Sequence, residues 1–157
     1  FIYLIKKLTI FAMHDLTPKQ KRMARIMALQ VIYAQEFQGS SIEKTFEHML
    51  DPTEFPEDKV ITYGKHLCVL TMTHKNNVDS IIKKRLKNWD FNRLTIIDRL
   101  ILRMSLVEML YEDEVPPKVS ITEGVEIAKQ FSTSDSSSFI NGILDAVYNE
   151  KLKEKTL

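Results

Sequence analysis

The chain has 157 residues, of which 44% are apolar and 27% charged, as is ordinary for a soluble globular protein of one domain. A net charge of +1 predicts no partner by itself, so any electrostatic recognition must be local. The single cysteine, Cys68, excludes an intramolecular disulfide, and no apolar run reaches the roughly 18 to 20 residues that cross a bilayer. These features favour a cytoplasmic protein without a membrane partner.

The first residues form an apolar stretch, Phe1 to Phe11, which Lys6 and Lys7 interrupt. The stretch lacks the basic start and the small-residue cleavage site of a secretory signal. Met13 precedes a polar segment and the first well-patterned helix. We therefore expect translation to start at Met13. Residues 1–16 are then an extension, residues 17–151 the domain, and residues 152–157 a polar tail.

Apolar spacing of three or four, with only four glycines and five prolines, predicts an all-α fold. The expected helices cover about residues 18–38, 41–50, 57–89, 93–111, 121–131 and 136–151, and Gly64 or Asn76-Asn77 would divide the third. Three helix starts carry a capping box, in which a hydroxyl and a Glu or Gln satisfy backbone N–H groups. These pairs are Thr17 with Gln20, Ser40 with Glu43, and Ser120 with Glu123.

Motifs of catalysis and of metal binding are missing from the sequence. It has no Gly-rich phosphate loop, no cysteine pair and no HExxH motif, and its four histidines do not show ligand spacing. Cys68 lies in an apolar run and is predicted to be a buried, inert thiol. We therefore predict no enzyme activity, no metal and no cofactor.

The first predicted helix has a cationic start. Lys19, Lys21, Arg22 and Arg25 fall in its first two turns, and no acid follows until Glu36. Cations at a helix N-terminus oppose the macrodipole, at about 0.3–1 kcal/mol each. Four cations in this unfavourable place indicate an anionic partner.

Aromatic and apolar residues continue the same side of this helix. At 100° per residue, Arg22, Arg25, Leu29 and Tyr33 share one side, and Gln30 lies near them. This combination suits single-stranded RNA, whose bases stack on aromatic rings while cations hold the phosphates. The alternative is a solvated basic end with Tyr33 packed inside.

Two later segments have mainly structural interpretations. Lys83-Lys84-Arg85 and Lys87 fall at a helix C-terminus, where the dipole favours cations, and Trp89 after them is predicted to anchor the core. The helix over residues 93–111 has a wide apolar face and should be central. In it Arg103 is predicted to form an ion pair, whereas Asp98 could face a protein partner.

Five motifs in order resemble the NusB family of bacterial transcription antitermination factors, over about residues 19–148. They are Arg22-Met23-Ala24-Arg25, Ala28-Leu29-Gln30-Val31-Ile32-Tyr33, Asp98-Arg99-Leu100-Ile101-Leu102-Arg103, Val115-Pro116-Pro117-Lys118-Val119 and Phe139-Ile140-Asn141-Gly142-Ile143-Leu144-Asp145. One departure is Ile121-Thr122-Glu123-Gly124, where the family usually has Ile-Asn-Glu-Ala, because Gly weakens a helix by roughly 1 kcal/mol relative to Ala.

The resemblance implies a bundle of about seven helices in two packed subdomains. It also implies binding of boxA-type single-stranded RNA, together with the ribosomal protein NusE, within an RNA polymerase antitermination complex that acts notably in ribosomal RNA operons. The RNA-binding residues then expected are Lys19, Lys21, Arg22, Arg25, Gln30, Tyr33 and Asp135. Those expected to contact the partner are Tyr33, Phe37 and Asp98.

Two other functions remain open at this point. One is a NusB-like module that targets ribosomal RNA for modification. The other is a helical adaptor that binds protein and has no affinity for RNA.

Overall fold

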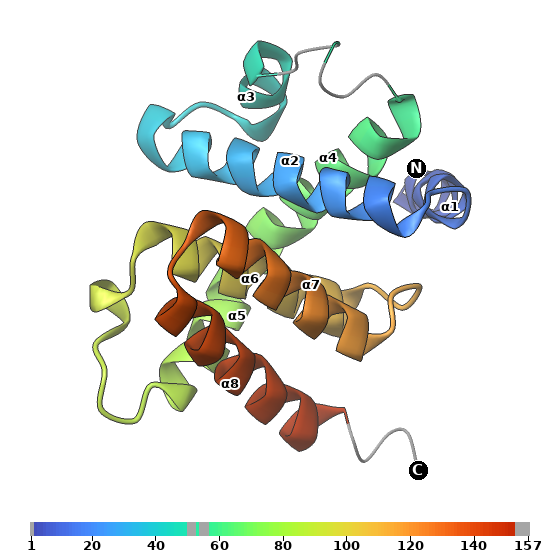
Figure 1. Cartoon of the computed structure of the whole chain (residues 1–157). Helices are drawn as coiled ribbons and strands as arrows, with labels where there is room; N and C mark the ends of the chain where they lie inside the picture. The colour runs from blue at the N-terminus through green and yellow to red at the C-terminus, as the bar shows by residue number, and fades with distance from the viewer. Residues whose placement is uncertain (1, 50–52, 54–56, 153–157) are drawn as a thin grey trace. The chain divides into compact units, whose positions relative to one another are not determined.

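The computed structural model describes residues 2–49, 53 and 57–152, and in this part of the chain the regular structure is helical, without strands (Figure 1). The prediction of an all-α fold is confirmed. The chain divides into two compact units, Phe1–Leu70 and Thr71–Leu157, which are described separately below. The elements are α1 (Ile2–His14), α2 (Pro18–Gln38), α3 (Ile42–Met49), α4 (Asp58–Thr73), α5 (Lys75–Arg85), the 3-10 helix η1 (Phe91–Arg93), α6 (Ile96–Tyr111), α7 (Pro117–Phe131) and α8 (Ser134–Lys151).

Local signals set both ends of α2 as the sequence predicts. The backbone N–H of Gln20 donates to Thr17 Oγ1 at 3.2 Å, and the backbone N–H of Thr17 donates to Gln20 Oε1 at 2.7 Å. Pro18 occupies the first helical position, where a missing N–H costs nothing. At the other end Gly39 has φ +62°, the left-handed conformation that ends helices and favours glycine.

The other two predicted capping boxes are wrong. At α3 the backbone N–H of Lys44 donates to Ser41 Oγ at 3.3 Å, so the capping hydroxyl lies one residue after Ser40. Helix α7 begins at Pro117, and Ser120 lies buried inside it. The fixed φ of Pro117 suits the first helical position and starts this helix earlier than a hydroxyl cap at Ser120 would.

The predicted division of the long helical region is also misplaced. Helix α4 ends at Thr73 and α5 begins at Lys75, so the break falls neither at Gly64 nor at Asn76-Asn77. Gly64 lies within α4, at a point where α2 approaches so closely that a side chain would not fit. A Cβ at this position would lie 2.2 Å from Met27 Cε and 3.0 Å from the Ala24 carbonyl oxygen.

The core of the first unit combines α2 with parts of α1, α3 and α4. Its fully or nearly buried side chains are Met13, Ala24, Met27, Ala28, Val31, Ile32, Phe46, Tyr63, Leu67 and Cys68. Burial raises the pKa of the Cys68 thiol to about 12, and the thiol donates to the Ala28 carbonyl oxygen over 3.6 Å. The prediction of a buried thiol is confirmed.

Helix α6 is the centre of the second unit, as expected. Its residues 100–109 are all buried, and α7 packs against both α6 and α8 (Figure 1). The Arg103 guanidinium forms two parallel hydrogen bonds with the Asp79 carboxylate, at 2.6 Å from Nε and 2.8 Å from Nη2. This confirms the predicted ion pair of Arg103.

The predicted core position of Trp89 is wrong, because 63% of this residue is exposed. Helix α5 ends at Arg85, so Trp89 falls in the turn before η1. Phe91 is buried instead, with Lys83 Nζ at 4.9 Å and Arg99 Cζ at 5.6 Å from its ring centroid. Phe91, and not Trp89, is therefore the core aromatic residue, and two cations lie over its ring.

Gly124 lies where α7 meets its neighbours, and a Cβ there would be 2.4 Å from Ser105 Oγ and 3.3 Å from Leu144 Cδ1. We expect Gly124→Ala to lower the free energy of unfolding by about 1–2 kcal/mol, because overpacking outweighs the gain in helix propensity. Gly142→Ala is the matched control in α8, since nothing lies within 4 Å of its Cβ position. It should raise stability by about 0.5–1 kcal/mol. Urea unfolding measures both, and a stabilised Gly124→Ala variant would contradict this account.

We expect Cys68 to resist a thiol-specific chromophoric disulfide reagent at pH 8 in the folded protein. The raised pKa leaves almost no thiolate at that pH, and the buried sulfur is shielded from the reagent. Full reaction within seconds should follow the addition of denaturant. Fast reaction without denaturant would show that the first unit opens readily.

Candidate nucleic-acid interface

The four cations at the start of α2 differ in their access to solvent. Lys19 is exposed, and Lys21 and Arg22 are half-buried. Arg25 is only 3% exposed, and its guanidinium carbon lies 5.9 Å from the ring centroid of Tyr63 in α4. The solvent-facing part of this basic start is therefore formed by Lys19, Lys21 and Arg22.

The side of α2 that was expected to join cations and aromatics is not continuous at the surface. Leu29 is buried, like Arg25, and it separates Arg22 from Tyr33. Gln30 is half-buried. Helical spacing alone placed these residues on one side, but α4 covers part of that side through Tyr63.

Two aromatic side chains lie exposed in the second half of α2. Tyr33 is 38% exposed and Phe37 is 63% exposed. Their ring centroids are 5.0 Å apart, with an angle of 57° between the planes. Tyr33 is thus not packed inside, and the pair offers an apolar surface of the kind that anchors protein partners or nucleic-acid bases.

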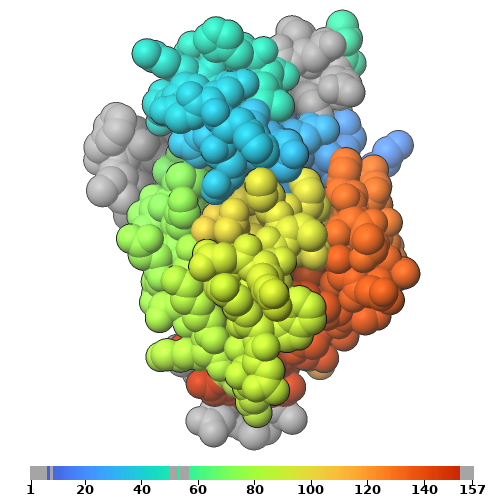
Figure 2. Space-filling view, turned by 90° about the vertical axis from the view of Figure 1, so that its left-hand side faces the viewer, coloured from blue at the N-terminus to red at the C-terminus, as the bar shows by residue number. Residues whose placement is uncertain are grey.

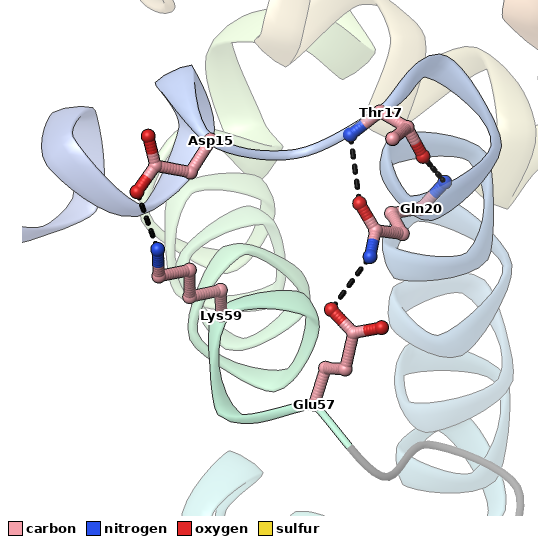
Figure 3. A network of polar contacts seen from close by, with 5 residues as sticks. All are labelled: Asp15, Thr17, Gln20, Glu57 and Lys59. Atoms are coloured by element: carbon pink, nitrogen blue, oxygen red, sulfur yellow. Dashed lines mark hydrogen bonds and ion pairs between the residues drawn. The ribbon is translucent and has the colours of Figure 1, made fainter.

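The carboxylate of Glu57, the residue just before α4, approaches the first turn of α2, which has no acid of its own. Gln20 Nε2 donates to Glu57 Oε2 at 2.6 Å, while the Oε1 of the same amide accepts the Thr17 N–H. Figure 3 shows Glu57 reaching from the start of α4 toward Gln20. Glu57 therefore supplies the negative charge that the macrodipole of α2 favours.

An ion pair lies beside this network. Lys59 in α4 contacts Asp15, in the short link between α1 and α2 (Figure 3). The Lys59 ammonium, through its hydrogen bond and its charge, lowers the pKa of the Asp15 carboxyl. The sequence did not indicate that α4 would hold the start of α2 in this way, since Glu57 and Lys59 are about 40 residues downstream.

In the second unit, Asp98 lies in the first turn of α6 and is 6% exposed. Ser132 Oγ donates to Asp98 Oδ1 at 2.7 Å, and Ser136 Oγ donates to Asp98 Oδ2 at 2.8 Å. Asp135, which precedes Ser136 in α8, is exposed. The two acids that were expected to be functional are therefore close together, but only Asp135 faces solvent.

A pocket of about 330 Å³ lies beside these residues. In the space-filling view of Figure 2, the surface of residues 85–100, in yellow tones, adjoins the orange surface of α7 and the start of α8. The sequence did not point to Trp89 or Phe139 as site residues, yet both line this pocket. Its lining residues are Trp89, Arg93, Leu94, Thr95, Asp98, Asp135, Ser136 and Phe139.

Within the described part of the chain, no three His, Cys, Asp or Glu side chains gather so that they could hold a metal ion. None of the described helices is long and apolar enough to cross a membrane.

The described part of the chain is thus an all-α protein with a basic and aromatic surface on the first unit and a pocket on the second. A model of the NusB family matches residues 22–149, which is most of the sequence. The chain belongs to the NusB family.

Individual relatives agree with this assignment. The transcription antitermination protein NusB of Chloroherpeton thalassium is 40% identical over 130 residues, which are 83% of this chain and 62% of that protein. The chain thus spans less than two thirds of this relative. The NusB protein of Geobacter sulfurreducens is 34% identical over 127 residues, which are 81% of this chain and 92% of that protein.

Solved structures show the same fold. T. maritima NusB superimposes with a TM-score of 0.78 at 31% identity, over 88% of this chain and 96% of that one. A NusB chain solved with NusE and double-stranded RNA has a TM-score of 0.76 at 23% identity, over 85% of this chain and 99% of that one. At this lower identity the second likeness concerns the fold alone.

Proposed function

We propose that this protein is a cytoplasmic transcription antitermination factor that binds boxA-type single-stranded RNA together with the ribosomal protein NusE. It joins an RNA polymerase antitermination complex, notably in ribosomal RNA operons, and acts by binding and not by catalysis. Membership of the NusB family and the antitermination proteins among its relatives support this function. The observation that carries the RNA part is the cationic start of α2, where the macrodipole favours an anion.

Lys19, Lys21 and Arg22 form the RNA contact in this proposal, because they are the cations of α2 that solvent reaches. Arg25 is buried beside the Tyr63 ring and adds its positive charge to theirs. Gln30, which is half-buried in the same helix, is a further RNA contact in this proposal. Asp135, which is exposed on the second unit, borders the RNA.

Tyr33 and Phe37 form the contact with NusE in this proposal, and the partly exposed ring of Tyr33 is also available to stack on an RNA base. An exposed aromatic pair is costly to leave in water and is typical of the anchors of protein interfaces. Asp98 was also expected to contact the partner, but it is only 6% exposed, and its carboxylate accepts hydrogen bonds from Ser132 and Ser136.

We expect Lys19→Ala/Lys21→Ala to weaken binding of a boxA-type RNA oligonucleotide and to reduce the log–log salt slope by about 1.4, at roughly 0.7 per phosphate contact. The matched control is Lys44→Ala/Lys65→Ala, which removes the same charge from exposed lysines of α3 and α4. Fluorescence anisotropy at several salt concentrations measures both variants. Equal losses in the two variants, or unchanged affinity in both, would reject a specific RNA site on α2, whereas a native protein without RNA affinity would favour the protein-binding adaptor.

For the partner, we expect Phe37→Ala to lower the affinity for NusE at least tenfold, because removal of an interface anchor costs about 2 kcal/mol or more. Phe11→Ala is the control, since Phe11 is an equally exposed phenylalanine of the same unit, in α1. Calorimetric titration with purified NusE gives both affinities. A Phe37→Ala variant that binds NusE like the native protein would remove the aromatic pair from the interface.

A further inference from the structure

The Asp98 carboxylate connects three helices of the second unit. It lies in the first turn of α6, and Thr95 Oγ1 accepts its backbone N–H at 3.1 Å. Its two oxygens accept hydrogen bonds from Ser132, at the end of α7, and from Ser136, in the first turn of α8. One buried side chain thus holds both ends of the link between α7 and α8.

The hydroxyl groups of Thr133 and Ser136 form a chain of hydrogen bonds that ends at the Asp98 carboxylate. Ser136 Oγ gives its only proton to Asp98, so it accepts the Thr133 hydroxyl, at 2.9 Å. Thr133 Oγ1 in turn accepts the Ser136 backbone N–H at 3.1 Å, which caps α8. The chain of donors runs from the helix cap to the carboxylate. Hydrogen bonds to a charged acceptor are roughly twice as strong as neutral ones, so Asp98 is the strongest point of this network.

The same network sets the side chains of the pocket. Asp135 precedes Ser136, and Phe139 lies one turn further along α8. Both line the pocket, with Trp89 and Arg93 from the segment before α6. A rotation of the first turn of α8 would move Asp135 and Phe139 relative to these residues. The bond from Asp98 to Ser136 opposes such a rotation.

We propose that Asp98 is a positioning residue, which acts on RNA through the α7–α8 link and not by touching a partner. Asp98 is 6% exposed, and each of its carboxylate oxygens accepts a hydrogen bond from a serine hydroxyl of the link, so the side chain is held within the protein. The resemblance implied a contact with the partner at Asp98, and the variants below separate that role from the positioning role. The proposal rests on the proposed function in one respect, namely that Asp135 borders the RNA.

Two sets of variants separate the two roles. Asp98→Asn keeps the shape of the side chain but loses the charge and one acceptor oxygen. Ser132→Ala/Ser136→Ala keeps Asp98 and removes both donors. If Asp98 acts through the link, each set should weaken RNA binding on the order of tenfold, since a hydrogen bond to a charged group contributes about this factor. The combined variant should lose little more than either set, because both break the same network.

The control is Asp145→Asn, which makes the same charge change at an exposed position of α8 and should leave RNA affinity unchanged. NusE affinity without RNA should be native in both variant sets. The proposal is overturned if Asp98→Asn lowers NusE affinity while the serine variant does not, since Asp98 would then meet the partner itself. It is equally overturned if the serine variant binds RNA like the native protein.

Amide hydrogen exchange without any ligand keeps this test independent of the proposed function. In both variant sets the amides of residues 133–139 should exchange at least several-fold faster than in the native protein, while those of residues 100–109 in α6 stay protected. Unchanged exchange in residues 133–139 would refute the positioning role. A native protein that does not bind RNA would refute the proposed function, and the exchange rates would still decide whether Asp98 holds the link.

Discussion

The function proposed here depends on one electrostatic conflict, the placement of cations at the positive end of the α2 macrodipole. Lys19, Lys21 and Arg22 repel that end and face solvent, without an acid in the first turn of their own helix. Glu57, just before α4, accepts a hydrogen bond from Gln20 and brings a negative charge to this end of α2. A polyanion would remove this conflict, which is why we propose the start of α2 as the RNA-binding surface.

The first unit holds this conflict in place by contacts that are mostly non-local. The capping box of Thr17 and Gln20 starts the helix, and Glu57 and Lys59 fix that start to α4. Arg25 is kept inside, against the ring of Tyr63. A binding helix whose first turn is fixed before the ligand arrives loses less conformational entropy on binding.

The sequence predicted well those features that neighbouring residues determine. The ends of α2 follow from Thr17, Pro18 and Gly39, and the central place of α6 follows from its apolar face.

Features that depend on distant residues were missed or misplaced. Helical spacing put Arg25 on the surface, because the sequence does not show that Tyr63 covers it. Trp89 was assigned to the core for its residue type, but the end of α5 at Arg85 leaves the buried position to Phe91. The burial of Asp98 was also missed, because the two serines that donate to its carboxylate lie more than 30 residues away in the sequence.

The salt dependence of RNA binding by the native protein, with NusE and without it, shows whether the cationic start of α2 holds a polyanion. Three or four phosphate contacts on a single strand predict a slope of about −2 to −3 in a plot of log affinity against log salt concentration. We expect this slope for boxA-type RNA, and higher affinity at each salt concentration when NusE is present. No measurable binding at low ionic strength, even with NusE, would contradict the proposed RNA-binding role.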